Sequence, residues 1–163
     1  MIFTIRPSQE GDMPEVLRLV HELATYEKEG DAVEVTVDDL IRDGFGARKL
    51  FHCFIGESDG EIVGMALIYE RYSTWKGPVI HLEDLIVTKR MRGSGLGSAL
   101  LAEVVKYGHQ LAVKRICWEV LDWNDSAIKF YESKGANVMR DWDVVQLDEA
   151  GIKNFLENTN RKD

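Results

Sequence analysis

The residues best suited to chemistry follow an apolar run at positions 82–87, where cations are succeeded by glycines. The cations and the alternating glycines are Lys89, Arg90, Arg92, Gly93, Gly95 and Gly97. Glycines let backbone N–H groups approach a ligand closely, and a helix that starts behind them favours negative charge at its N-terminus. The pattern predicts a phosphate-binding loop between a strand and a helix, although an ordinary tight turn would use glycines in the same way.

Two common phosphate motifs are excluded by position. The P-loop pattern Gly-x-x-x-x-Gly-Lys-Ser/Thr does not occur in the chain. The dinucleotide pattern Gly-x-Gly-x-x-Gly fails because Ser98 or Leu100 occupies its last position. The pattern that fits is Arg-x-x-Gly-x-Gly, read as Arg92, Gly95 and Gly97. Whether the Arg92 guanidinium itself touches phosphate is left open by the sequence.

Length and composition favour one globular domain. The chain has 163 residues, of which 45% are hydrophobic, and this is enough for a sizeable core. Its formal net charge of −8 argues against general binding to nucleic acids or anionic membranes. No signal-peptide pattern opens the chain, and no apolar run approaches the ~18 residues that span a bilayer. We therefore expect a cytoplasmic protein without nucleic-acid or membrane partners.

The cysteines and histidines show no pattern of a metal site or a disulfide framework. Cys53 and Cys117 each lie in an apolar, strand-like run and are expected to be buried, reduced thiols. The histidines lack the spacing of metal ligands, so no metal is predicted and all are expected to be structural or on the surface: His21, His52, His81 and His109.

Strands and helices are expected to alternate along the whole chain. The strands are predicted near 2–6, 50–57, 61–70, 79–87, 116–121 and 144–147, and the helices near 12–27, 36–44, 96–111, 124–135 and 148–156. This mixture predicts an α/β (α+β) fold with a mixed sheet in a single domain over residues 1–163. Residues 158–163 are polar and are expected to fray. Helix caps are predicted at Asp12 with Glu15, at Thr36 with Asp39, at Asn124 and at Asp148, and Gly135 is predicted to end the helix that Asn124 begins.

A second motif identifies the family. Residues 124–136 read Asn-Asp-Ser-Ala-Ile-Lys-Phe-Tyr-Glu-Ser-Lys-Gly-Ala and follow the glycines after one predicted strand. The two motifs together resemble the GCN5-related N-acetyltransferase (GNAT) superfamily. A closer resemblance, to the diamine (spermidine/spermine-type) and thialysine N-acetyltransferases, extends along nearly the whole chain and is carried by residues 22–27, 43–46, 82–84, 119–124 and 135–136. A short hairpin at 58–60 and a compact loop before Trp142 depart from that family, which leaves the amine open.

The resemblance implies a mostly antiparallel sheet in which acetyl-CoA lies between two splayed strands, one ending at Val87 and one near Leu121. It implies that the pantetheine pairs with Leu85, Ile86 and Val87. The residues implied to contact the rest of the cofactor are Arg92, Gly93, Ser94, Gly95, Leu96, Gly97, Ser98, Asn124 and Ser126. The resemblance also implies a homodimer.

Catalytic roles follow from the same resemblance. Tyr131 matches the general acid that protonates the departing thiolate, and a phenol with a pKa near 10 is protonated at neutral pH; it could also simply pack. Glu83 could remove a proton from the amine through water or hold a distal ammonium. Asp84 adjoins it on a strand, so the two side chains are expected on opposite faces. Tyr26 and Glu27 match substrate contacts, or a solvated helix end.

The expected activity is direct acetyl transfer from acetyl-CoA to a primary amine of a small polycationic substrate, such as a polyamine, a diamine or a thialysine-like compound. One alternative is a non-catalytic module that senses acyl-CoA, for which Tyr131 would serve no purpose. Another alternative is a protein acetyltransferase that acts on lysine or an N-terminus. The carboxylates at Glu27 and Glu83 favour a short polycation over a protein.

Overall fold

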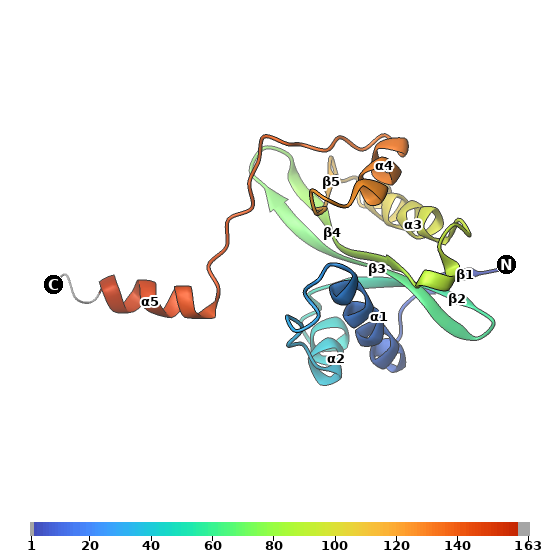
Figure 1. Cartoon of the computed structure of the whole chain (residues 1–163), viewed down its shortest axis with the longest axis horizontal. Helices are drawn as coiled ribbons and strands as arrows, with labels where there is room; N and C mark the ends of the chain where they lie inside the picture. The colour runs from blue at the N-terminus through green and yellow to red at the C-terminus, as the bar shows by residue number, and fades with distance from the viewer. Residues whose placement is uncertain (1, 160–163) are drawn as a thin grey trace. The chain divides into compact units, whose positions relative to one another are not determined.

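A five-stranded mixed sheet forms the centre of the first part of the chain (Figure 1). The strands lie in the order β1 (Thr4–Pro7), β2 (His52–Ser58), β3 (Glu61–Ser73), β4 (Gly77–Val87) and β5 (Ile116–Cys117). The first four are antiparallel neighbours, and β5 runs parallel to β4. This computed structural model describes residues 2–159 and confirms the predicted mostly antiparallel sheet flanked by helices.

The chain forms two compact units, residues 1–121 and 122–163, which are described separately. The first unit holds the whole sheet, the helices α1 (Met13–Tyr26), α2 (Val37–Phe45) and α3 (Leu96–Gln110), and the short 3-10 turns η1 (Glu10–Asp12) and η2 (Lys89–Met91). The second unit holds α4 (Asp125–Ser133) and α5 (Glu149–Thr159). The prediction of one domain over residues 1–163 stays a prediction.

The sheet of the first unit is covered on both faces. Figure 1 shows α1 and α2 on one face and α3 on the other. The core beneath α1 and α2 consists of Met13, Val16, Leu19, Leu40, Cys53, Ile55, Met65, Leu67 and Ile86. On the opposite face a Cβ at Gly56 would lie 2.6 Å from Leu96, and one at Gly64 would lie 3.2 Å from Leu100. Glycine at these two positions therefore lets α3 pack closely on the sheet.

Local capping signals decide where several elements begin. At α2 the predicted box is present, because Thr36 Oγ1 accepts from the Asp39 N–H at 3.2 Å and Asp39 Oδ2 accepts from the Thr36 N–H at 3.0 Å. Asp12 does not cap α1 as expected. Its carboxylate instead accepts from the Gln9 N–H at 2.7 Å and pairs with Arg6 at 2.7 Å, which ties η1 to the sheet edge.

Strand β5 is much shorter than the predicted strand 116–121. It pairs with β4 only where Ile80 faces Ile116 and His81 faces Cys117. Just beyond, β4 carries a bulge: Leu82 faces Ile68 on β3 and Asp84 faces Leu67, so that Glu83 is one extra residue. A bulge bends the strand and increases its local twist. We attribute the early end of the β4–β5 pairing to this bend, which leaves the following part of β4 unpaired on that side.

The second unit follows its predicted start and stop signals. Asn124 Oδ1 accepts from the Ala127 N–H at 3.3 Å and caps α4, and Gly135 ends the segment with a left-handed φ of +85°. Asp148 Oδ1 accepts from the Gly151 N–H at 2.7 Å at the start of α5. This helix continues to Thr159, so residues 158 and 159 of the predicted frayed tail are helical, and residues 160–163 lie outside the described residues.

The predicted strand 144–147 is wrong, because the segment has no regular structure. The segment pairs with no strand among the described residues, and Val145 is 91% exposed. A strand needs a partner for its backbone groups. The apolar residues of segment 144–147 are therefore not enough by themselves to form a strand.

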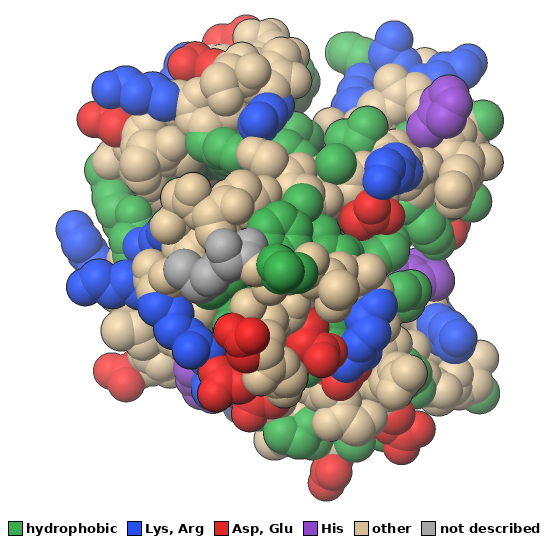
Figure 2. Space-filling view, turned by 90° about the vertical axis from the view of Figure 1, so that its right-hand side faces the viewer, with side chains coloured by type: hydrophobic (Ala, Val, Ile, Leu, Met, Phe, Trp, Pro, Cys, Tyr) green, Lys and Arg blue, Asp and Glu red, His purple; other side chains and the backbone are tan. Residues whose placement is uncertain are grey.

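Charge is distributed in small pairs on the described surface. On the face shown in Figure 2, acidic and basic side chains lie interspersed. Ion pairs such as Arg6 with Glu57 and Arg42 with Asp39 hold this arrangement locally.

Cys53 and Cys117 are free thiols, as expected, but only Cys53 is fully buried. Among residues 2–159, no helix combines the length and the apolar character needed to cross a bilayer.

Candidate active site

The loop between β4 and α3 has the geometry of an anion site. We call residues 88–95 the glycine loop. Gly93 and Gly95 have left-handed φ values of +79° and +90°, and no heavy atom lies within 4 Å of a Cβ built at either position. Gly95 is the N-cap of α3, and the amides of the first turn have no earlier helical carbonyl to pair with. Open space above free amides fits the pyrophosphate predicted for residues 93–98.

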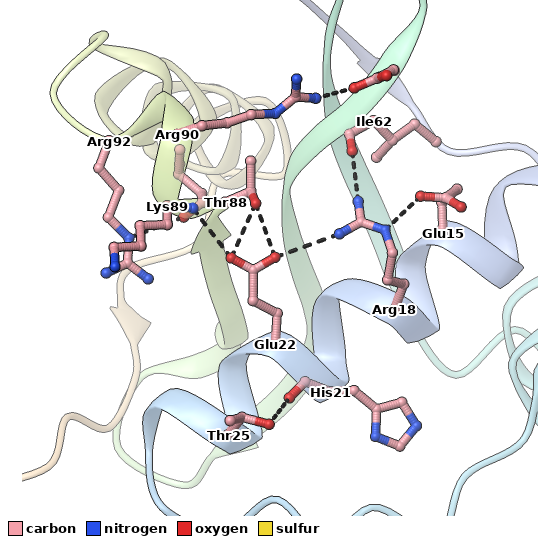
Figure 3. A network of polar contacts seen from close by, with 12 residues as sticks. Glu15, Arg18, His21, Glu22, Thr25, Ile62, Thr88, Lys89, Arg90 and Arg92 are labelled. Carbon is pink, nitrogen blue, oxygen red and sulfur yellow. Dashed lines mark hydrogen bonds and ion pairs between the residues drawn. The ribbon is translucent and has the colours of Figure 1, made fainter.

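A partly exposed polar network holds the start of the glycine loop against α1. The Glu22 carboxylate accepts from the Thr88 hydroxyl at 2.9 Å and from the Lys89 N–H at 3.2 Å (Figure 3). Arg18 lies 3.4 Å from the same carboxylate, and it also donates to the Ile62 carbonyl on β3 at 2.8 Å. The loop, α1 and β3 are thus joined at one point. The sequence had singled out Glu22 only as part of a family resemblance.

Two of the three cations that precede the glycines have partners on the neighbouring strands. Arg90 pairs with Glu61 at the start of β3. Arg92 Nε donates to the Val87 carbonyl at 3.3 Å, and its guanidinium lies 4.8 Å from the centre of the Tyr26 ring. Arg92 therefore connects the end of β4 to the end of α1, where substrate contacts are expected, and the phosphate contact stays a prediction.

The edge of β4 that follows the bulge is open. Leu85, Ile86 and Val87 face Ala66, Met65 and Gly64 of β3 on one side. On the other side, the pairing with β5 ends at His81 in the described chain. An unpaired strand edge can accept an extended ligand as an added strand. The structure thus leaves this edge of β4 unpaired, and the binding of pantetheine along it stays a prediction.

The bulge also changes which way the carboxylates point. Asp84 faces Leu67 and His81 faces Tyr69, and these two β3 residues share a face because they are two positions apart. Glu83 Oε2 lies 3.4 Å from His81 Nε2. Glu83 and Asp84 therefore lie on the same side of the sheet, the side of α1. The expectation of opposite faces was wrong because it assumed unbroken alternation.

We call Glu27, Glu83 and Asp84 the carboxylate group. Burial, together with the neighbouring charges of Glu83 and Glu27, raises the pKa of Asp84 to about 6. Burial also raises the pKa of Glu27. Glu27 follows the end of α1, which closes at Lys28 in a left-handed conformation with φ +66°. Such a concentration of negative charge favours a cationic ligand.

His81 lies behind the carboxylate group and was expected to be merely structural. Its ring stacks on Tyr69 at 4.9 Å, and its Nδ1 lies 3.7 Å from Cys117 Sγ. Its position two residues before Glu83 on a strand was the only signal in the sequence. Within residues 2–159, no group of three or more His, Cys, Asp or Glu side chains has the arrangement of a metal site.

Three further predicted residues belong to the second unit. Tyr131 is 9% exposed, and its ring lies 5.3 Å from that of Phe130. Asn124 Oδ1 accepts from the Ser126 hydroxyl at 3.1 Å in addition to its capping bond. Capping is thus the observed role of Asn124. The catalytic role of Tyr131 and the cofactor contacts of Asn124 and Ser126 stay predictions.

Comparison with known proteins adds independent findings. A family model described as "Acetyltransferase (GNAT) family" matches residues 16–136. The chain is 40% identical over 140 residues to the thialysine N-epsilon-acetyltransferase of Bos taurus, covering 81% of this chain and 82% of that protein. It is 41% identical over 145 residues to the spermidine/spermine N(1)-acetyltransferase-like protein 1 of Homo sapiens, covering 82% of this chain but only 20% of that longer protein.

A solved structure shares the fold. The integron cassette protein VCH_CASS6 from the mobile metagenome of V. cholerae superposes with a TM-score of 0.79 over 96% of this chain and 99% of its own, at 20% identity. At that identity the likeness concerns the fold alone.

Proposed function

The chain belongs to the acetyltransferase (GNAT) family and is an acyltransferase, and from that premise we propose that it acetylates a primary amine of a small polycationic substrate. The family uses acetyl-CoA as the acetyl donor. The observation that carries the substrate class is the carboxylate group, three acidic side chains gathered where α1 ends beside the bulge of β4. Relatives named for thialysine and for spermidine and spermine support the same class.

We assign the roles as follows. Glu83 takes a proton from the incoming ammonium, directly or through one water, because an amine with a pKa near 10.4 arrives protonated. Asp84 and Glu27 hold a second cationic centre, with Tyr26 beside them. The open edge of β4 binds the pantetheine, and the glycine loop binds the pyrophosphate. Tyr131 donates a proton to the departing thiolate. Bound acetyl-CoA supplies the acetyl group as a thioester.

An acetyl-CoA consumption screen tests the proposal. The substrates are spermidine, a short diamine, thialysine, a monoamine of matched length and a lysine-containing peptide. A charge-assisted hydrogen bond contributes roughly 1.5–3 kcal/mol, so compounds with two cationic centres should exceed the monoamine about ten- to hundredfold in kcat/KM. Binding without turnover would favour an acyl-CoA sensor, and preference for the peptide would favour a protein acetyltransferase.

We further propose that residues 1–163 act as one N-acetyltransferase domain, that it is cytoplasmic, and that two copies form a homodimer. These proposals are supported by the family resemblance. Analytical ultracentrifugation of the full chain measures the last of them directly, and a monomer at micromolar concentration would contradict it.

A further inference from the structure

We propose that His81 is a positioning residue that orients Glu83 and takes up the proton that Glu83 removes from the amine. The inference rests on the proposed function, because it concerns the amine of that reaction. It addresses a step that a lone carboxylate performs poorly. The ordinary pKa of a glutamate is about 4.3, whereas that of an alkylammonium is about 10.4. A proton passed on to an imidazole, with an ordinary pKa of about 6.5, meets a base roughly a hundredfold stronger.

The geometry places the two side chains in series. Glu83 Oε2 lies 3.4 Å from His81 Nε2, and the side chains are 53% and 8% exposed respectively. Glu83 thus reaches the solvent side of the site, while His81 lies behind it in the protein. The bulge places Asp84 on the same side of the sheet.

The proposed transfer needs the tautomer of His81 that carries its hydrogen on Nδ1. Cys117 Sγ donates to the Ile80 carbonyl at 3.6 Å and lies 3.7 Å from Nδ1, where it can accept that hydrogen. With the hydrogen on Nδ1, the lone pair of Nε2 faces Glu83. The thiol on β5 therefore orients the ring for transfer from the carboxyl group.

The other titratable groups on this side do not compete for the proton. Tyr69 stacks on the ring, and burial raises the pKa of its phenol, which keeps it neutral. Arg71 lies 3.9 Å from Cys117 Sγ and is always charged. Glu119 acts on Tyr69 only as a further negative charge. Glu27 and Asp84 belong to the carboxylate group, in which Glu83 is the member that faces His81.

The protons balance over one turnover. One N–H proton of the ammonium moves to the Glu83 carboxylate, and the resulting carboxyl O–H passes its proton to His81 Nε2, forming an imidazolium–carboxylate pair. The neutral amine then forms the new C–N bond while the C–S bond breaks, and Tyr131 protonates the departing thiolate. The second N–H proton, which the nitrogen loses as the amide forms, returns to the Tyr131 phenolate through solvent. The imidazolium finally releases its proton to solvent, which leaves the acetylated amine, the CoA thiol and one free proton.

The pH dependence of kcat/KM for spermidine tests the proposal in the full chain. In the His81→Gln variant the rate at pH 7 should fall about tenfold or more. Its acid limb should move toward lower pH by about two units, from the imidazole range to the carboxylate range. The KM for acetyl-CoA should stay unchanged. His109→Gln, which removes an exposed imidazole at the end of α3 and keeps His81, Cys117 and Glu83, serves as the control and should retain the position of the acid limb. A loss that is equal at every pH would show a merely structural role and would overturn the inference.

A second measurement is independent of activity and of the His81→Gln fold. NMR titration of the His81 ring signals compares the wild type with Glu83→Gln. Removal of a facing carboxylate should move the midpoint to lower pH by at least about half a unit. An unmoved midpoint would overturn the inference even in an active enzyme. The wild type could acetylate none of the amines while the His81 midpoint still differs from that of Glu83→Gln as expected. That result would support the coupling of His81 to Glu83 and would reject the proposed function.

Discussion

The glycine loop and the carboxylate group lie at either end of the last part of β4, yet they are stabilised in opposite ways. In the loop, Glu22 binds both Thr88 and Lys89 and is itself neutralised by Arg18. In the carboxylate group, the charges repel one another and raise the pKa of Asp84. Among the described residues, no cation lies within ion-pair distance of Glu27 or Asp84.

The difference follows from what each region is proposed to bind. Backbone amides must be held in place before an anion arrives, because ordering a loop at the moment of binding costs affinity. A cationic ligand instead supplies the charge that the carboxylates lack. One region is therefore complete in the free protein, and the other is electrostatically unsatisfied until a ligand enters. Substitutions in the first region should affect acetyl-CoA, and those in the second should affect the amine.

The largest effect is expected at Gly95. In Gly95→Val the new side chain occupies the open space above the amides and should remove one or more charge-assisted bonds, lowering the affinity for acetyl-CoA roughly hundredfold or more. Gly77→Val is the matched control, since Gly77 has a similar φ of +82° and equally open space at the far end of β4. Both variants should lose a similar stability, of the order of 1–2 kcal/mol. Calorimetry showing equal affinity in both would reject the phosphate site.

Tyr131 belongs to neither region and provides a reference. Tyr131→Phe keeps the ring and its contact with Phe130 but removes the proposed acid. General acid catalysis contributes about a hundredfold or more, so kcat should fall by that factor while acetyl-CoA and amine affinities hold. Full activity would instead indicate that Tyr131 only packs.

Within the carboxylate group, Glu27→Gln should reduce the preference for two cationic centres, because Glu27 is proposed to hold the second one. The kcat/KM ratio of spermidine to a matched monoamine is expected to shrink about tenfold, while acetyl-CoA affinity stays unchanged. If both substrates lose the same factor, Glu27 does not select the second charge.

Asp84 should make the stability of the free protein depend on pH. Its folded pKa, about 6, lies above its ordinary value of 3.8, so ionisation opposes folding. The stability that the protonated Asp84 carboxyl contributes is fully present below pH 3.8 and is lost as the pH rises through 6. Relative to the wild type, Asp84→Asn should therefore gain about 1–3 kcal/mol of unfolding free energy between pH 4 and pH 8. Denaturant titrations at these two pH values measure the gain, and a constant difference would contradict it.

The smallest effect is expected at Glu22. Glu22→Gln keeps an oxygen acceptor but loses the charge that strengthens the bonds to Thr88 and Lys89, so acetyl-CoA affinity should fall about three- to tenfold. The spermidine-to-monoamine ratio should not change. If Glu22→Gln changes the spermidine-to-monoamine ratio and leaves the acetyl-CoA affinity unchanged, the two regions do not bind separate ligands as proposed.

The sequence by itself determined the features that depend on neighbouring residues. The glycine loop, the Thr36–Asp39 capping box and the Asn124 cap formed where predicted, because each needs only side chains and amides a few positions apart. The family followed for the same reason, since its two motifs are short and ordered.

Only the tertiary structure decided how distant residues meet. The bond from Glu22 to Thr88 spans 66 positions, and the bulge at Glu83 arises from the register of β4 against β3. That single extra residue reversed the expected alternation, placed Asp84 beside Glu83 and ended the pairing with β5 early. A periodic pattern carries no information on register or on which strands lie together, because both depend on contacts throughout the fold. The contacts of His81 with Glu83, Tyr69 and Cys117 could therefore not be predicted before the strand pairing was known.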